Sequence, residues 1–353
     1  MTHTRKSSDL LETGPSMSKL DVFRVLDLSQ PACATKKPRV SFVYEPVQRW
    51  IDCGSLAVMY EELERPKTGD ELVHASMQFQ FHVLVTMAET MHRAWLANRD
   101  AWDTHTNFHH IEGLIGEGKE FFSKRIQQEL SVRHTLIRVD RDLAARPGVT
   151  PTAVVTERSL YSSNEVFAAT MKDLKAWTET ENAIYDDAFR LWNLKLPNDG
   201  IPRSFMRLRT SDVHTCMARL KMRGRDAEKD VKIEYQQRLR DHHDRAFGGT
   251  DGYVAILADN SVLRLCDYRV DDHTTHSGRK CCIRCTPAVE WPAPLKRALK
   301  ALNDNTLERI RGVVPVYVFV IDEDVRTDPE GVDKHIQRAA DIIDHSLDCV
   351  YDE

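Results

Sequence analysis

The fold class is decided by the stretch RVSFVYEPVQRW, residues 39–50. Residues 40–44 form a short apolar run with β-branched and aromatic side chains, which predicts a buried strand. Pro46 cannot donate to a strand ladder, so the strand ends there and the carboxylate of Glu45 lies at its carboxyl end. Ligands of open α/β sheets bind at this edge, and Trp50 follows closely enough to line the same crevice. A solvated turn is the alternative interpretation of such a Glu-Pro pair.

Further strands are predicted at residues 22–28, 153–156, 204–209 and 313–321. They alternate with predicted helices at residues 53–63, 72–97, 118–141, 212–247 and 330–346. This alternation predicts an α/β fold in which helices flank a mostly parallel sheet. Parallel strands gather their carboxyl ends at one edge, so we expect Glu45, the Glu157-Arg158 pair and Asp322 to lie close together.

Two segments are expected to be insertions in a single domain of residues 21–353. The first, residues 98–148, is polar and predicted to be helical. Its histidines are expected on a polar helix face: His105, His109 and His110. The second, residues 248–312, is predicted to be β-rich, with a hairpin that turns near Asp259-Asn260. Residues 1–20 are expected to form a disordered arm.

The composition is that of an ordinary globular protein, with 41% hydrophobic and 29% charged residues. No apolar run approaches the length of about 18 residues that a membrane-spanning helix needs, and the N-terminal region lacks the apolar core of a signal peptide. A net charge of −5 argues against broad binding to nucleic acid or to anionic membranes. We therefore expect reduced cysteines and a cytoplasmic protein, in the host cytoplasm if the source is viral. A mitochondrial location stays open.

Charged and polar residues near the predicted strand ends can build a site for phosphoryl transfer. Glu45 beside Arg158 would stay ionised and accept a proton from a hydroxyl nucleophile. Glu157 is a candidate ligand of a divalent cation, and the amide of Gln80 can pair with the edge of a nucleobase. A basic cluster interrupts the helix of residues 212–247 and suits a phosphate-bearing ligand under a lid: Arg219, Arg223 and Arg225. Solvated arginines and a satisfied helix glutamine are the alternatives.

Seven motifs in this order resemble those of the deoxyribonucleoside kinase family, which includes mitochondrial thymidine kinase and the deoxycytidine and deoxyguanosine kinases. They are Glu45-Pro46-x-x-x-Trp50, Met59-Tyr60, Phe79-Gln80 with Thr86-Met87, Glu157-Arg158-Ser159 with Phe167, Leu208-Arg209-Thr210, Arg223-x-Arg225-x-x-Glu228 with Tyr235, and the strand of residues 315–322 that ends in Asp322. The likeness covers residues 22–97, 150–247 and 313–346. It implies a P-loop-kinase-like parallel sheet flanked by helices.

The resemblance also implies a role for each matched residue. Glu45 resembles the general base that takes the proton from the sugar 5′-hydroxyl, and Arg158 resembles the residue that orients this base and the phosphoryl group. Glu157 resembles the carboxylate associated with Mg²⁺. The other matches imply a substrate pocket and a lid: Gln80 as base reader, Trp50 and Phe167 as apolar walls, Tyr60 and Glu228 at the 3′-hydroxyl, and Arg219, Arg223 and Arg225 at the moving phosphoryl group.

The implied activity is the transfer of the γ-phosphate of ATP to a deoxyribonucleoside in nucleotide salvage, with Mg²⁺ as cofactor. No nucleic-acid or membrane partner is expected, and the family is commonly homodimeric. Members that accept deoxycytidine or purines often have Asp where this chain has Ser163, which favours a pyrimidine substrate. A catalytically impaired relative that binds nucleosides or has a structural role is the alternative.

The phosphate-binding loop of the family, G-x-x-x-x-G-K-[ST], is expected just before the opening strand. Residues 29–39 contain no glycine, so Thr35 and Lys36 are predicted to belong to a degraded loop. Three explanations stay open. The protein has lost phosphoryl transfer and kept another role, the sequence lacks an internal segment, or Lys36, Lys37 and Arg39 bind the donor in a different way.

The second predicted insertion contains a His-x-x-His pair and a Cys-x-x-Cys pair. Together they can form a Cys₂His₂ zinc site: His273, His276, Cys282 and Cys285. The two pairs lie closer together in the sequence than in common zinc fingers, so free surface thiols are the alternative.

Overall fold

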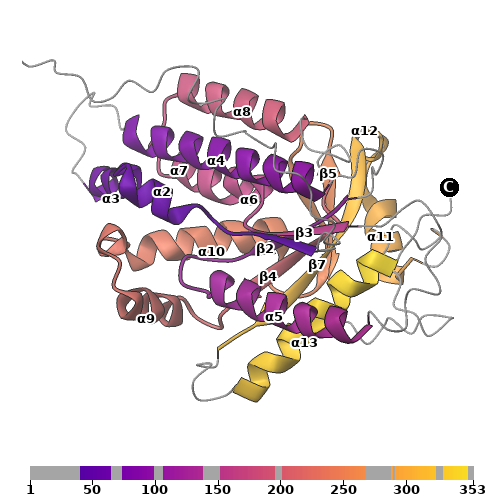
Figure 1. The fold of residues 1–353 in the computed structure, drawn as a ribbon. Coiled ribbons are helices and arrows are strands. Elements are labelled where there is room, and N and C mark those ends of the chain that lie inside the picture. Colours follow the sequence, from indigo (N-terminus) through magenta and orange to yellow (C-terminus); the bar gives the residue numbers. More distant parts are fainter. Residues whose placement is uncertain are drawn as a thin grey trace, which may run out of the picture. The chain divides into compact units, whose positions relative to one another are not determined.

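The computed structural model describes residues 40–64, 74–98, 106–137, 152–194, 201–267, 288, 291–322 and 329–348. All of them belong to one unit, Pro38–Glu353. The strands are β1 (Val40–Val43), β2 (Thr106–Glu112), β3 (Thr152–Glu157), β4 (Ser204–Arg209), β5 (Gly252–Leu257), β6 (Val262–Asp267) and β7 (Ile310–Val320). They form a seven-stranded sheet in the order β1-β3-β2-β4-β7-β5-β6 (Figure 1).

The sheet is mostly parallel, as predicted. β1, β3, β2, β4 and β7 pair in parallel, whereas β5 is antiparallel to both β7 and β6. The α/β fold class is therefore confirmed. The predicted strand at residues 22–28 and the predicted arm at residues 1–20 lie outside the described residues.

The segment of residues 98–148 contributes a strand to the sheet as well as the predicted helix, which is α5 (Lys119–Ile137). Its strand β2 lies between β3 and β4 in the middle of the parallel strands, where Phe108 pairs with Val154 and His110 pairs with both Thr156 and Phe205. The expectation of a purely helical insertion is corrected by this pairing. The strand β2 was not predicted because its sequence, TNFHHIE, has no continuous apolar run.

Helices cover both faces of the sheet (Figure 1). The described helices of the chain are α2 (Val47–Asp52), α3 (Ser55–Glu64), α4 (His74–Asn98), α5 (Lys119–Ile137), α6 (Leu160–Ser162), the π-helical segment η2 (Ser163–Ala168), α7 (Ala169–Asp173), α8 (Glu179–Leu194), α9 (Val213–Arg223), the 3₁₀ turn η4 (Asp226–Glu228), α10 (Ile233–Phe247), α11 (Ala293–Ala301), α12 (Asp304–Glu308) and α13 (Pro329–Asp348). The break predicted inside residues 212–247 corresponds to η4.

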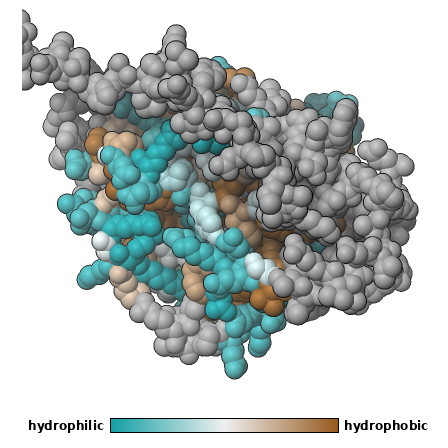
Figure 2. Space-filling view, in the orientation of Figure 1, coloured by the Kyte–Doolittle hydropathy of each residue, from teal (hydrophilic) through white to brown (hydrophobic). Residues whose placement is uncertain are grey.

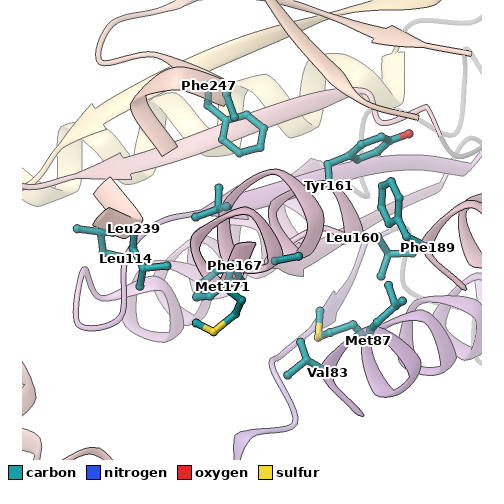
Figure 3. Close-up of a cluster of buried hydrophobic side chains, with 14 of the residues drawn as sticks. Val83, Met87, Leu114, Leu160, Tyr161, Phe167, Met171, Phe189, Leu239 and Phe247 are labelled. Carbon is teal, nitrogen blue, oxygen red and sulfur yellow. The ribbon is translucent and has the colours of Figure 1, made fainter. Parts of the chain in front are cut away.

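The two faces of the sheet carry separate hydrophobic cores. Successive side chains of a strand point to opposite faces, so Val154 of β3 packs with α4 and α8, whereas Ala153 and Val155 pack with α5 and α13. Figure 3 shows part of the larger core, with Val83 and Met87 of α4 on one helix face near the helical segment that carries Phe167 and Met171. This core reaches the strand ends where the candidate site lies.

His109 and His110 are buried in β2 rather than exposed on a helix, so that expectation was wrong; His105 lies outside the described residues. The ring nitrogens of His109 bond with Ser204 Oγ at 2.8 Å and Ser346 Oγ at 2.9 Å. Nδ1 of His110 lies 2.5 Å from Thr156 Oγ1, whose hydroxyl donates to the carbonyl of residue 158. The ring of His110 must therefore donate its Nδ1–H to Thr156 Oγ1.

We predict that His110 makes the fold sensitive to acid. Burial lowers the pKa of His110 from 6.5 to about 3. Between these pH values the unfolded chain binds more protons than the folded chain, so stability is lost as the pH falls. Between about pH 7 and 4 the contribution of His110 to this loss is about 3 kcal/mol. The His110→Gln variant is therefore expected to show a shallower fall in the free energy of unfolding, measured with urea between about pH 7 and 4.

The control for this prediction is His214→Gln, because His214 is exposed on α9. This variant is expected to keep the acid dependence of the parent protein. An unchanged dependence in His110→Gln as well would contradict the prediction.

The predicted β-hairpin is present at residues 252–267. β5 and β6 pair in antiparallel fashion, and Asn260 in the turn adopts a left-handed conformation with φ 65°. Asn tolerates this conformation better than most residues. Tyr253 of β5 and Leu295 of α11 form a small separate core on this side of the sheet.

The surface of the described residues is largely hydrophilic on the face shown in Figure 2, and hydrophobic atoms are visible in the recesses between hydrophilic side chains. Among the helices that the structure describes, none combines the length and the apolar character that crossing a bilayer requires.

Candidate functional site

A cavity of about 450 Å³ lies at the carboxyl ends of β1, β2 and β3. Its lining includes every predicted site residue within the described ranges: Glu45, Trp50, Tyr60, Gln80, Glu157, Arg158, Phe167, Arg219, Arg223, Arg225 and Glu228. Asp322 does not line it, and its carboxylate accepts the backbone N–H of Ser211 at 2.5 Å. The volume suits a small-molecule ligand.

Glu45 and Arg158 form an ion pair in this cavity. Nε of Arg158 lies 2.6 Å from Oε1 of Glu45, and the side chains are 7% and 11% exposed, respectively. Burial acts to raise the pKa of Glu45, but the positive charges of Arg158 and Lys119 outweigh it and hold the pKa below its ordinary value. Glu45 is thus an ionised proton acceptor at a strand end.

Arg158 is held in its position by an unusual backbone conformation. Its φ is 66°, a left-handed conformation that costs a non-glycine residue about 1–3 kcal/mol. The backbone N–H donates to the carbonyl of Ile111 at 2.8 Å, and the guanidinium lies 3.7 Å from the ring centroid of Phe167. These contacts fix the guanidinium beside Glu45.

An apolar compartment with one free amide lies next to this ion pair. The indole of Trp50 donates to Thr86 Oγ1 at 3.0 Å and meets Phe79 edge-on at 5.8 Å. Gln80 is fully buried; among the described residues its Nε2 makes a long contact of 3.9 Å with Met59 Sδ, and its Oε1 has no hydrogen-bond partner there. A buried amide with unused donors and acceptors is suited to a polar, planar ligand.

The lid arginines are paired with Glu228. Arg223 contacts the buried carboxylate of Glu228, and Arg225 lies 3.5 Å from its other oxygen. Arg219 donates to the carbonyl of Ile321 at 3.1 Å. Tyr60 shares this region: burial, and then the nearby Tyr235 and Glu228, raise its pKa well above the ordinary value, so it remains a neutral hydrogen-bond donor.

A glycine-rich loop joins β2 to α5 and forms another wall of the cavity. Its sequence is GLIGEGKE, residues 113–120, which has the spacing G-x-x-x-x-G-K of a phosphate-binding loop. Gly116 needs to be glycine, because its φ is 92° and an added Cβ would lie 2.7 Å from the carbonyl oxygen of Cys216. The loop leads into the N-terminus of α5, which favours anions.

The lysine of this loop lies at the cavity. Nζ of Lys119 donates to the carbonyls of Gly113 at 3.1 Å and Leu114 at 3.3 Å, and the side chain is buried. Residues 113–119 thus carry a glycine-rich spacing that the prediction of a degraded loop did not consider. Thr35 and Lys36, the residues predicted for a degraded loop, lie outside the described residues.

The sequence prediction missed Gly113 to Lys119 because the family order places the phosphate loop before the strand of Glu45, whereas in this chain it follows the helix of Gln80. The G-x-x-x-x-G-K spacing is the signal that identifies it. One position departs from the pattern, since Glu120 stands where a serine or threonine is usual.

Glu157 is the residue best suited to hold Mg²⁺. Its side chain is buried, and Oε1 has no hydrogen-bond partner within the part of the chain that the structure describes. Burial and the neighbouring charge of Glu45 raise the pKa of Glu157 to about 7, so a bound cation would favour its ionised form. Glu120 also lines the cavity. Within the described ranges no cluster of three or more metal-ligating side chains occurs; His273, His276, Cys282 and Cys285 lie outside them.

Comparison with known proteins gives partial matches. The family model described as Deoxynucleoside kinase matches residues 136–265. The chain is 38% identical over 93 residues to deoxycytidine kinase 2 of Gallus gallus, which is 25% of this chain and 33% of the relative. It is 34% and 33% identical over 92 residues to the deoxycytidine kinases of Rattus norvegicus and Homo sapiens, covering 25% of this chain and 34% of each relative.

The chain thus spans about a third of the length of the curated relatives it matches. The matched region includes β3, Arg158 and the lid, so it contains one half of the ion pair described above. Residues 136–265 of the chain are thus similar to the deoxynucleoside kinase family, and the mostly parallel α/β sheet is consistent with a P-loop-kinase-like fold.

Proposed function

We propose that this protein transfers the γ-phosphate of ATP to the 5′-hydroxyl of a deoxyribonucleoside. The observation that carries the proposal is that Glu45, Lys119 and the lid arginines line the same cavity. Phosphoryl transfer needs three kinds of group in one place: a proton acceptor, a lysine that binds phosphate, and arginines that can contact the transferred phosphoryl group.

In the proposed reaction, the nucleoside lies between Trp50 and Phe167 with its base at the free amide of Gln80. Glu45 accepts the proton of the 5′-hydroxyl, and Arg158 keeps Glu45 ionised until then. The hydroxyl oxygen forms a bond to the γ-phosphorus of ATP, and ADP leaves as the bond to the β,γ-bridging oxygen breaks.

The donor side of the proposed reaction uses the phosphate loop and the lid. Backbone N–H groups of the loop at residues 113–119, other than those of Leu114 and Glu117, hold the phosphates of ATP together with the ammonium of Lys119. Glu157, with Glu120 nearby, would hold Mg²⁺, which neutralises phosphate charge when bound. Arg223 and Arg225 are proposed to exchange Glu228 for the phosphoryl oxygens as the lid closes, which frees Glu228 to accept the 3′-hydroxyl together with Tyr60.

The preferred base is proposed to be a pyrimidine. The hydroxyl of Ser163 donates to the carbonyl of Ser159 at 3.2 Å, so this position offers no charge to the cavity. Gln80 can pair with a pyrimidine edge as donor and acceptor. Homodimerisation, a role in nucleotide salvage and the cytoplasmic location stay predictions from the sequence.

A second candidate function is nucleoside binding without turnover. It is favoured by Glu120, because a carboxylate in place of the usual hydroxyl adds negative charge beside the donor phosphates. The pairing of Glu120 with Lys124 at 2.6 Å offsets part of that charge.

The test is a direct assay of phosphate transfer from γ-labelled ATP to thymidine, deoxycytidine, deoxyadenosine and deoxyguanosine, with calorimetric binding of ATP and of each nucleoside alongside. We expect 5′-monophosphate formation with the pyrimidines preferred, and no transfer to 5′-deoxythymidine. Nucleoside binding without any product would support the second candidate. Absence of nucleoside binding would overturn both.

A further inference from the structure

The phosphate loop contains a carboxylate that the proposed reaction does not use. Glu117 is a loop residue, and its side chain is fully buried and points away from the cavity, into the protein. Its Oε2 accepts the backbone N–H of Leu114 at 2.6 Å and a guanidinium N–H of Arg207 at 2.8 Å. Its Oε1 accepts the backbone N–H of Thr210 at 3.2 Å.

We propose that Glu117 is a positioning residue that sets the shape of the phosphate loop and ties it to the helix behind the lid. The proposal rests on the proposed function, because it assigns the loop to ATP. No reacting atom is assigned to Glu117 itself.

The loop is built closely around this carboxylate. At Gly113 an added Cβ would lie 2.8 Å from Oε2 of Glu117, so the first glycine of the loop leaves the space that the carboxylate needs. The hydrogen bond that the N–H of Leu114 donates to Glu117 directs this N–H into the loop. It also holds the start of the loop against Glu117 in its second half. A loop held in this way keeps its other N–H groups directed at a ligand before the ligand arrives, which lowers the ordering cost of binding.

Glu117 also connects the loop to β4 and to α10. Arg207, fully buried, is the fourth residue of β4, and Thr210 follows the end of that strand. Nη2 of Arg240 on α10 lies 3.6 Å from Oε1 of Glu117 and donates to Thr210 Oγ1 at 2.7 Å. One turn later on the same helix, Asp244 lies 3.7 Å from Arg207. Because α10 follows the lid residues directly, one buried charge network contacts both the loop and the lid helix.

A buried ion pair alone is weak evidence of function, since such pairs often contribute little net stability. What distinguishes this pair is that two backbone N–H groups, of Leu114 in the loop and Thr210 after β4, depend on the same carboxylate. A neutral amide has one acceptor oxygen, so it cannot serve both N–H groups and Arg207. Glu117→Gln should therefore alter the loop and not only remove a charge.

The experiment compares the full-length protein with Glu117→Gln and with Glu117→Gln/Arg207→Met, in which the charge left behind is also removed. Calorimetry measures Kd for ATP and for thymidine, and urea unfolding measures stability. We expect Glu117→Gln to weaken ATP binding about 10- to 100-fold and to leave thymidine binding unchanged. The double variant is expected to regain stability without regaining ATP affinity.

The matched control is Asp251→Asn. Asp251 is also buried, accepts a backbone N–H, from Val318, and pairs with an arginine, Arg338, but it does not line the cavity. This variant is expected to lose stability and to keep its affinity for ATP.

The outcomes separate the two proposals. Equal ATP affinity in the wild-type protein and Glu117→Gln, or recovery of ATP affinity in the double variant, would overturn the positioning role while leaving the proposed function intact. If Glu117→Gln does not fold, the ATP affinity of the double variant tests the positioning role. An affinity equal to that of the wild-type protein would overturn the role, and a weakened affinity would support it. A wild-type protein that binds thymidine but not ATP would overturn the donor assignment and the positioning role together.

Discussion

Replacing Glu45 by Gln is expected to lower kcat for deoxynucleoside phosphorylation about 10²- to 10⁴-fold. The amide keeps the size of the side chain but cannot accept the proton of the 5′-hydroxyl. It also loses the charge that pairs with Arg158 at 2.6 Å. Steady-state kinetics with saturating ATP and nucleoside measure the effect on kcat, and calorimetry measures nucleoside binding, which is expected to weaken far less than kcat falls.

The control for this prediction is Glu61→Gln, because Glu61 is an exposed carboxylate on the neighbouring helix α3. Its kcat is expected to equal that of the wild-type protein. If Glu45→Gln retained full kcat while Glu61→Gln did the same, another group would have to accept the proton, and Glu157, with its pKa raised to about 7, would be the next residue to test.

Replacing Lys119 by Met is expected to lower kcat/KM for ATP about 10²- to 10³-fold, the effect typical of removing one preorganised donor from a charge-stabilising site. Lys119 is buried, and its Nζ donates to the loop carbonyls of Gly113 and Leu114, which a phosphate-bound lysine would release. Thymidine affinity is expected to stay at the wild-type value, because Lys119 lies on the donor side of the cavity.

Lys172→Met is the matched control for Lys119→Met. Lys172 is ion-paired with Asp186 at 2.7 Å and lies on α7, outside the lining of the cavity. The variant is expected to keep its kcat/KM for ATP. Wild-type kinetics in Lys119→Met would show that the loop at residues 113–119 does not bind the donor, and would return attention to the lysines of residues 29–39.

Most strands were predictable because their side chains carry the signal locally. β1, β3 and β7 have continuous apolar runs, as expected for strands of a parallel sheet that are buried on both faces. β4 was predicted at its observed bounds. β2 escaped prediction because His109, His110 and Asn107 stand where apolar residues are usual. Their burial is possible only because Ser204, Thr156 and the carbonyl of Ser346 supply hydrogen bonds from other elements.

The same contrast holds for the candidate site. Residue types and short spacings were enough to predict the ionised Glu45 beside Arg158 and the basic lid, because these motifs are local or follow a strand end. The phosphate loop carries an equally local spacing, yet its place in the chain gave no indication that it faces Glu45. That depends on β2 pairing between β3 and β4.

The sequence by itself determined the α/β class, the charged residues at the strand ends and the approximate position of each apolar strand, since alternation, proline and charge act over a few residues. Only the tertiary structure decided which strand lies in the middle of the sheet, and with it the neighbours of Glu45 across the cavity. Strand order depends on pairings between residues that are far apart in the chain, such as Phe108 with Val154 and His110 with Phe205, which no short stretch of sequence encodes.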